Sequence, residues 1–327
     1  MKKIHKNILI GTSIFILIMV ALLTSATFYL QWYALQAEGN PRGKDISGSF
    51  EYIKAHYPHI QTWLDSITYN HALKDTFILA KDNTKLHAYF LQADSCTTQS
   101  AVIIHGYTDN AIRMMHIGYM YHHDLQYNIL LPDLRYSGLS EGTHIQMGWN
   151  DRKDVLQWIE VAHELFATDT TRCNMVVHGI SMGGATTMCV SGEKTPDYVR
   201  CFINDCGYTS VWDEYAGELK EQFGLPTFPL LHLASWLTDI RFGWNFNEAS
   251  PLQQIKQCER PMLFIHGAND TFVPTWMSDT LYQHKNGIKE IWHAPGGNHA
   301  DSYYKYPKEY TEIVKRFLEK YNIMKSP

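Results

Sequence analysis

The chain opens with an apolar stretch whose pattern differs from everything that follows it. Residues 8–30 contain no charged side chain over 23 positions, and a helix of this length can cross the roughly 30 Å hydrocarbon layer of a membrane. Lysines precede the stretch and aromatic residues lie at its far end: Lys2, Lys3, Lys6, Tyr29, Trp32 and Tyr33. This arrangement predicts one transmembrane helix with its N-terminus in the cytoplasm.

The rest of the chain would then lie outside the cytoplasm, in a single-pass, membrane-anchored protein. A cleaved signal peptide ending near Thr24-Ser25-Ala26 is the alternative, and it would leave a secreted protein. The apolar run exceeds the roughly 7 to 15 residues that signal peptides use, so we favour an uncleaved anchor, residues 1–37. Residues 38–69 predict a polar linker followed by a surface helix that Pro58 interrupts.

Beyond residue 70, short apolar runs alternate with segments of helical length. Residues 76–80 and 85–92 flank a polar turn and predict a β-hairpin. Further apolar runs predict buried strands at 101–104, 127–131, 174–177, 201–204, 262–265 and 290–293. The segments between them predict helices at 110–123, 151–167, 181–191, 275–284 and 308–320. This alternation predicts an α/β fold with a mostly parallel, doubly wound sheet.

One connection is too long for a simple loop. Residues 207–260 separate two predicted strands and contain many large apolar side chains, Phe223, Trp236 and Phe246 among them. We interpret this segment as a small, mostly helical cap, inserted into one domain that extends over residues 70–327.

Composition limits the partners that the chain can have. Hydrophobic residues make up 45% of the chain and charged residues 19%, which is the balance of a globular protein with a sizeable core. The net charge of -5, spread along the sequence, argues against a nucleic-acid partner. The cysteines lack zinc-binding spacing, so we expect no metal and no cofactor, and their pairing stays open.

The most informative motif follows the predicted strand at 174–177. It reads His178-Gly179-Ile180-Ser181-Met182-Gly183-Gly184. A serine between two glycines at a strand-to-helix turn is typical of a nucleophile elbow, because glycine lets the chain turn sharply and expose the serine oxygen. Ser181 is therefore the candidate nucleophile.

Two other strand ends carry candidate partners for Ser181, since functional residues gather at the carboxyl ends of parallel strands. Asp270 lies on the loop after residues 262–265, and His299 follows a glycine pair after residues 290–293. Imidazole can accept the serine proton near neutral pH, and a carboxylate behind it fixes its tautomer. We expect His299 to be the base and Asp270 the acid. Asp205, at the end of residues 201–204, is the alternative acid.

The reaction also needs backbone N–H groups that donate to the oxyanion formed on the substrate. Met182, the residue after the nucleophile, should supply one of them. The second should come from the loop that follows residues 101–104, and there we choose Tyr107.

These motifs, in this order, resemble the α/β-hydrolase superfamily, and more narrowly its small-cap branch of serine esterases and peptidase-like proteins. The resemblance covers residues 70–325 and rests on His105-Gly106, residues 133–140, the Ser181 elbow, and the loops of Asp270 and His299. The chain departs from the family pattern at Tyr136, where many relatives have glycine. The loop at residues 105–110 also lacks the three-glycine run of one lipase group.

The resemblance implies a serine hydrolase that acts without a cofactor. Ser181 would attack an ester-type carbonyl of a small or lipid-like acyl substrate, and His299 would activate the water that releases the acyl group. Carboxylic ester hydrolysis is the first expectation, because the chain has no large additional domain to select peptides. A serine peptidase or thioesterase is the alternative. A non-catalytic, membrane-tethered binding protein is a hypothesis of another class.

Overall fold

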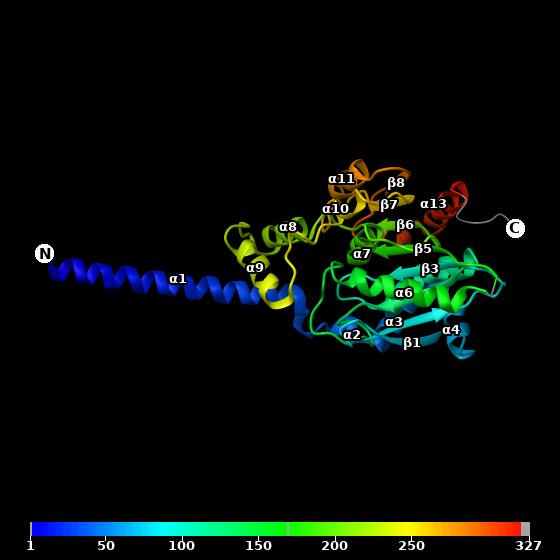
Figure 1. Ribbon diagram of the computed structural model, residues 1–327, viewed down its shortest axis with the longest axis horizontal. Coiled ribbons are helices and arrows are strands. Elements are labelled where there is room, and N and C mark those ends of the chain that lie inside the picture. Colours follow the sequence, from blue (N-terminus) through cyan, green and yellow to red (C-terminus); the bar gives the residue numbers. More distant parts are fainter. Residues whose placement is uncertain (1, 169, 322–327) are drawn as a thin grey trace.

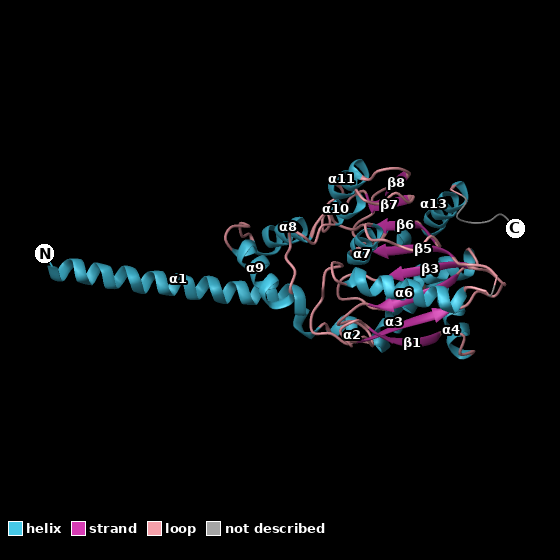
Figure 2. Cartoon of the chain, viewed as in Figure 1, coloured by secondary structure: helices cyan, strands magenta, loops and turns pink. Residues whose placement is uncertain are grey.

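A single sheet of eight strands forms the centre of the molecule in the computed structural model, which describes residues 2–168 and 170–321 (Figure 2). Its strand order is β1-β2-β4-β3-β5-β6-β7-β8. The strands are β1 (Lys74–Leu79), β2 (Lys85–Leu91), β3 (Gln99–Ile104), β4 (Asn128–Asp133), β5 (Asn174–Ile180), β6 (Val199–Asp205), β7 (Met262–Gly267) and β8 (Lys289–Ala294).

The sheet is mixed at one edge and parallel elsewhere. β1 and β2 form the predicted antiparallel hairpin, and β2 pairs antiparallel with β4. All remaining pairs are parallel, so the prediction of a mostly parallel sheet is confirmed. Side chains alternate between the two faces: Val102 and Ile104 of β3 lie in one core, and Ala101 and Ile103 in the other. Burial on both faces explains why these strands are apolar without interruption.

Helices cover both faces of the sheet (Figure 1). One face carries α6 (Asp151–Phe166), α7 (Met182–Ser191), α10 (Pro251–Ile255) and α11 (Trp276–His284). The other carries α3 (Ile46–His56), α4 (Gln61–Tyr69), α5 (Met115–Tyr119), α12 (Ser302–Lys305) and α13 (Pro307–Lys320). The helix predicted at 110–123 is broken into the 3-10 turn Ala111–Met114, α5 and the π-turn Met120–Asp124.

Residues 207–260, the predicted cap, contain α8 (Val211–Phe223), α9 (Leu230–Phe242) and α10. Of these, α8 and α9 lie beyond the carboxyl ends of the parallel strands (Figure 1), whereas α10 packs on a face of the sheet. Ser210 begins α8 by accepting a hydrogen bond from Asp213 N, and Gly224 ends it in the left-handed conformation. The cysteines are all unpaired, and every one except Cys96 is buried.

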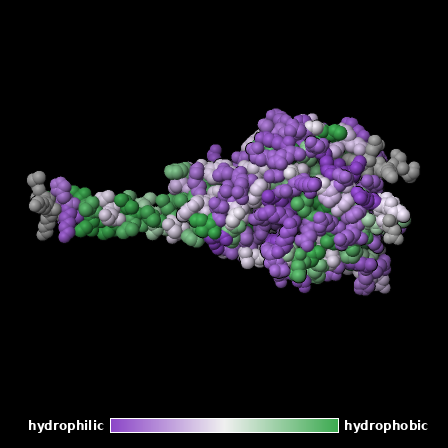
Figure 3. Space-filling model, viewed as in Figure 1, coloured by the Kyte–Doolittle hydropathy of each residue, from purple (hydrophilic) through white to green (hydrophobic). Residues whose placement is uncertain are grey.

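The N-terminal helix α1 (Lys2–Gln36) is a rod that projects from the cap end of the body (Figures 1 and 3). Side chains 4–22 are all exposed. By length and composition, α1 could cross a membrane. Its last turns contact the body through Thr27, Gln31 and Leu35, which are buried and follow the i, i+4 spacing of one helix face. The helix therefore has an exposed apolar part and a packed part.

Residues 38–48, for which composition predicts a linker, are mostly exposed, but hydrogen bonds fix them to the body. The Asn40 side chain is buried, accepts from Gly43 N to begin α2 (Pro41–Lys44), and donates to Tyr136 O at 2.8 Å. Asp45 begins α3 in the same manner by accepting from Gly48 N. The Asn, Pro and Gly residues of this segment form helix caps and tight turns, and they hold the end of α1 in place.

Candidate active site

Ser181 stands at a strained turn between β5 and α7. Its φ of 58° and ψ of -121° are unfavourable for a side chain with a Cβ atom. The turn is also very close to its neighbours. A Cβ atom on Gly179 would lie 2.0 Å from Gly183 O, and one on Gly183 would lie 2.1 Å from Ile104 O. Only glycine fits at these two positions, which explains the motif around Ser181.

The structure brings the three predicted side chains into one hydrogen-bonded line. His299 Nε2 lies 2.8 Å from Ser181 Oγ, and His299 Nδ1 lies 2.8 Å from Asp270 Oδ2. With the proton on Nδ1, His299 donates to the carboxylate and can accept the serine proton at Nε2. Asn269 N donates to Gly297 O at 2.7 Å, so the loops that carry the acid and the base are held together.

The surroundings of Asp270 keep its carboxylate ionised. Burial raises its pKa, but hydrogen bonds from His266 and His299 outweigh this effect and lower the pKa to about 2. Its other oxygen, Oδ1, accepts from Phe272 N and Val273 N, each at 3.0 Å. The carboxylate is thus fixed in position and carries the negative charge that an imidazolium on His299 would need.

The alternative acid, Asp205, faces away from His299. Its carboxylate accepts from the Tyr310 hydroxyl at 3.0 Å, and Tyr310 is 2.9 Å from His178 Nε2. The link of Asp205 to the elbow is through its main chain, where Ser181 N donates to Asp205 O at 2.8 Å. The geometry therefore favours Asp270 as the partner of His299.

We expect Asp205 to make stability depend on pH. Burial raises its pKa to about 7, against the opposing effects of Tyr310 and His266. Because the unfolded chain releases this proton near pH 4, ionisation penalises the folded state as the pH rises from about 4 to about 7, by at most about 4 kcal/mol. Urea unfolding in detergent should show wild-type stability falling over this range relative to Asp205→Asn. Parallel stability curves for the two proteins would contradict the assignment.

Both residues expected to donate to the oxyanion lie beside Ser181. Tyr107 and Met182 line the same cavity as Ser181, and a Cβ atom on Gly106 would lie 3.4 Å from Ser181 Cβ. The loop before Tyr107 therefore packs directly on the elbow. The roles of Tyr107 and Met182 as oxyanion donors stay predictions.

The segment after α1 holds the loop that carries Tyr107. The Tyr107 hydroxyl donates to Ala34 O at 2.8 Å. Arg42 donates to Tyr107 O and Thr108 O, each at 3.1 Å, and Asn110 Nδ2 donates to Gly43 O at 3.2 Å. The candidate oxyanion loop is thus tied to the end of the apolar helix.

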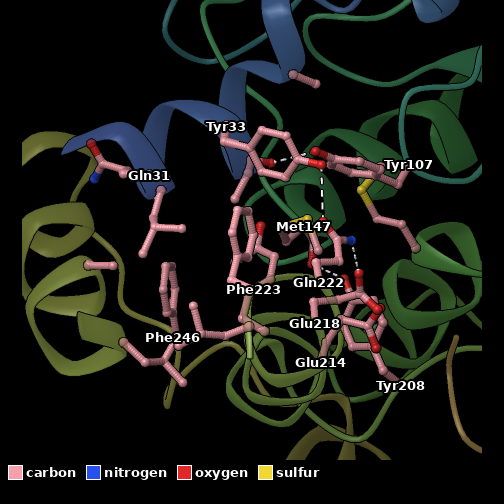
Figure 4. Close-up of a pocket in the computed structure, with 18 of the residues that line it drawn as sticks. Gln31, Tyr33, Tyr107, Met147, Tyr208, Glu214, Glu218, Gln222, Phe223 and Phe246 are labelled. Atoms are coloured by element: carbon pink, nitrogen blue, oxygen red, sulfur yellow. Dashed lines mark hydrogen bonds between the residues drawn. The ribbon is translucent and has the colours of Figure 1, made fainter. Parts of the chain in front are cut away.

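Two cavities meet at Ser181, Tyr107 and Phe272. The first, of about 400 Å³, has a mainly apolar lining drawn from α1, α8 and α9 (Figure 4). The second, of about 480 Å³, lies toward Arg42, Asp109 and other polar groups, and His299 lines it. A volume of several hundred Å³ suits a small ligand. The arrangement provides an apolar chamber and a more polar chamber on two sides of the serine.

Cys206, Asp270 and His299 could in principle hold a metal, since their ligand atoms lie within 4.8 Å of one another. Burial raises the pKa of the Cys206 thiol well above its usual value, whereas a metal binds the thiolate. His299 already hydrogen-bonds to both Asp270 and Ser181. These residues therefore do not fit a metal site.

Sequence reasoning missed two parts of the site. His266 Nε2 donates to Val273 O and lies 3.3 Å from Asp270 Oδ2. Its place near the carboxyl end of β7, on the strand that leads to the acid, was the available signal. The end of α1 was the second omission. Thr27 and Gln31, polar residues within the apolar helix, were the sign that one helix face packs on protein.

Comparison with known proteins agrees with this fold. A family model described as the prolyl oligopeptidase family matches residues 121–322. The uncharacterized protein YqkD of Bacillus subtilis is 31% identical over 227 residues, which cover 69% of this chain and 73% of YqkD. The alpha/beta hydrolase domain-containing protein WAV2 of Arabidopsis thaliana is 26% identical over 255 residues, which cover 76% and 79% of the two chains.

The esterase Pf2001 of Pyrococcus furiosus has a similar structure, with a TM-score of 0.61 and 22% identity over 76% of this chain and 91% of its own. At this identity the likeness concerns the fold. The family match extends over most of the described body and includes Ser181, Asp270 and His299. The chain therefore belongs to the prolyl oligopeptidase family and has the α/β-hydrolase fold.

Proposed function

We propose that this protein is a serine hydrolase that cleaves an ester-type bond through an acyl-enzyme intermediate. The observation that carries the proposal is the hydrogen-bonded line of Ser181, His299 and Asp270 at the edge of a mainly apolar cavity. An activated serine needs such a base and such an orienting carboxylate. The apolar cavity suits the acyl part of an ester.

The reaction has two stages. Ser181 Oγ bonds to the carbonyl carbon while His299 Nε2 takes its proton, and the N–H groups of Tyr107 and Met182 donate to the oxyanion. The carbon–oxygen bond to the alcohol then breaks, and the alcohol takes the proton from His299. Water next gives a proton to His299 and attacks the acyl-enzyme, which releases the acid and restores Ser181.

We further propose that α1 anchors the protein through residues 8–30, with the body outside the cytoplasm. The exposed apolar surface of α1 supports an anchor, and the lysines before it support a cytoplasmic N-terminus. A signal peptide cleaved near Ala26 would remove the exposed part of α1 and leave the packed part.

A fluorophosphonate probe tests the hydrolase proposal, because it reacts with activated serines. We expect the purified full-length protein to be labelled and the Ser181→Ala variant to remain unlabelled, although equally folded by circular dichroism. Absence of labelling in folded wild-type protein would overturn the proposal and favour a binding protein.

Peptide hydrolysis is the second candidate, since the matching family is described by an oligopeptidase. An ester and an anilide that share one acyl group separate the two activities. We expect the ester to be cleaved with the higher kcat/KM. A higher value for the anilide would assign the site to peptide bonds.

A further inference from the structure

The last turns of α1 form one wall of the apolar cavity. Tyr33 lies across from Gln222 and Phe223 of α8, and Gln31 lines the cavity beside α9 (Figure 4). The helix that carries the apolar, exposed N-terminal stretch therefore also closes the chamber beside Ser181. Entry to the chamber is consequently determined where α1 leaves the body.

Two aromatic side chains stand at the junction of α1 and α8. The rings of Tyr33 and Phe223 meet edge to face with their centroids 5.7 Å apart. Each side chain lines the cavity and is 38% exposed, so the pair stands between the chamber and the outside. An exposed hydrogen bond from the Tyr33 hydroxyl to Gln222 Oε1, 3.1 Å long, connects the two helices there.

The cap surface beside α1 is apolar. Gln31 donates to Thr238 Oγ1 at 2.9 Å, which packs α9 against α1. On the outside of α9, Trp236 and Ile240 are each 62% exposed and share a helix face, and Phe228 before α9 is 71% exposed. Figure 3 shows the apolar surface of α1 continuing onto this end of the body. Exposed apolar patches of this kind mark binding surfaces.

A lipid bilayer is the occupant that fits this patch. The patch adjoins the helix that is long and apolar enough to cross a membrane, and α9 packs on that helix close to Tyr29 and Trp32, aromatic residues of the kind found at membrane interfaces. A bilayer crossed by α1 would therefore meet Trp236 and Ile240 and the Tyr33–Phe223 rim on the same side of the body.

We propose that the cavity is filled from the membrane, and that the substrate is an acyl ester lipid residing in the bilayer that α1 spans. Its acyl chain passes between Tyr33 and Phe223 into the apolar chamber, and its carbonyl carbon reaches Ser181 Oγ. The leaving alcohol lies toward the polar chamber near Arg42. This inference rests on the proposed ester hydrolysis and specifies its substrate.

Two carboxyl groups on the chamber wall, those of Glu214 and Glu218, oppose an apolar chain when they are ionised. Burial raises the pKa of Glu218 and raises that of Glu214 well above its usual value. Both shifts favour the neutral carboxyl, which an acyl chain can contact at lower cost.

The test places the full-length protein in phosphatidylcholine vesicles that retain it through an alkaline carbonate wash. A fluorogenic ester with two long chains is added either to the same vesicles or to separate vesicles, at equal total lipid. Confinement raises the effective concentration, so we expect cleavage in the same vesicles to be at least about 10-fold faster. Equal rates would overturn the inference, as would loss of the protein in the wash.

Surface variants give the second arm of the test. In the double variant Trp236→Gln, Ile240→Gln, two apolar side chains that would be buried in the bilayer are replaced by polar ones. We expect the ratio of vesicle-ester cleavage to cleavage of the soluble ester p-nitrophenyl butyrate to fall about 10-fold. The matched control is Tyr69→Gln with Ile288→Gln, two exposed residues outside the cavities and the cap, which should leave the ratio unchanged. An unchanged ratio in the first pair would overturn the inference.

The two proposals fail in different ways. If the soluble ester is cleaved and Ser181 is labelled, but the vesicle ester shows no preference for the same vesicles, the hydrolase proposal stands and the membrane-filled cavity is excluded. If neither ester is cleaved and folded protein is unlabelled, both proposals fall.

Discussion

Replacement of Asp270 by asparagine is expected to lower kcat about 10,000-fold, which is the usual cost of losing the orienting carboxylate. The main-chain N–H groups of Phe272 and Val273 hold one oxygen of this side chain. The new amide would keep that oxygen in place and turn its NH2 group toward His299 Nδ1. The histidine proton would then move to Nε2, where it blocks acceptance of the Ser181 proton. The measurement is turnover of p-nitrophenyl butyrate at pH 7.

Asp205→Asn is the matched control for this experiment. It makes the same chemical change on a carboxylate that hydrogen-bonds to Tyr310 and not to His299. We expect its kcat to stay within about 3-fold of wild type, since no proton of the reaction passes through it. A severe loss in Asp205→Asn together with an active Asp270→Asn would transfer the acid role to Asp205.

The second large effect is expected from Gly183→Ala. The added methyl group would lie 2.1 Å from Ile104 O and 2.7 Å from His105 O, so the end of β3 and the loop toward Tyr107 must move away from the elbow. Overpacking of this kind costs about 3 kcal/mol of unfolding free energy. Displacement of the oxyanion donors by about 1 Å should lower kcat about 100-fold. Thermal unfolding and ester turnover measure the two effects.

Gly217→Ala is the control for the glycine experiment. Gly217 lies within α8 with no atom closer than 4 Å to the position of an added methyl group. Alanine should stabilise this helix by up to about 1 kcal/mol. If Gly183→Ala instead matched wild type in both melting temperature and kcat, the close packing of the elbow on β3 would be disproved. If Gly183→Ala accumulates poorly, labelling of its folded fraction with the fluorophosphonate probe still measures the reactivity of Ser181.

Much of the fold could be predicted because its signals are local. The β1–β2 hairpin, the buried parallel strands and the helical cap follow from short patterns of apolar residues. Ser181, Asp270 and His299 could be proposed together because each follows a predicted strand, and parallel strands end at the same edge of a sheet. The common edge of the parallel strands thus allowed three residues far apart in the sequence to be placed in one site.

The remaining features depend on contacts that no local pattern describes. Gln31 contacts Thr238 across 207 positions of sequence, and apolar periodicity does not identify the partner of a helix face. The helix predicted at residues 110–123 is present at residues 111–124, but its hydrogen bonding changes from 3-10 to α to π along the segment, which apolar spacing does not reveal. Asn110 begins this segment as its N-cap by accepting from Ile112 N, and Asp133 accepts from Ala111 N; the contact with Asp133 joins residues 22 positions apart.

Residues 30–41 line the apolar chamber and also join α1 to the body, so under the proposed anchoring one segment serves both the attachment and the chamber. A protease that cut between Ala34 and Arg42 would then release the body and remove part of the chamber wall in one event. Such a cut would also separate the loop of Tyr107 from Ala34. A shed form that keeps its specificity therefore requires a cut before Thr27, where the packed face of α1 begins.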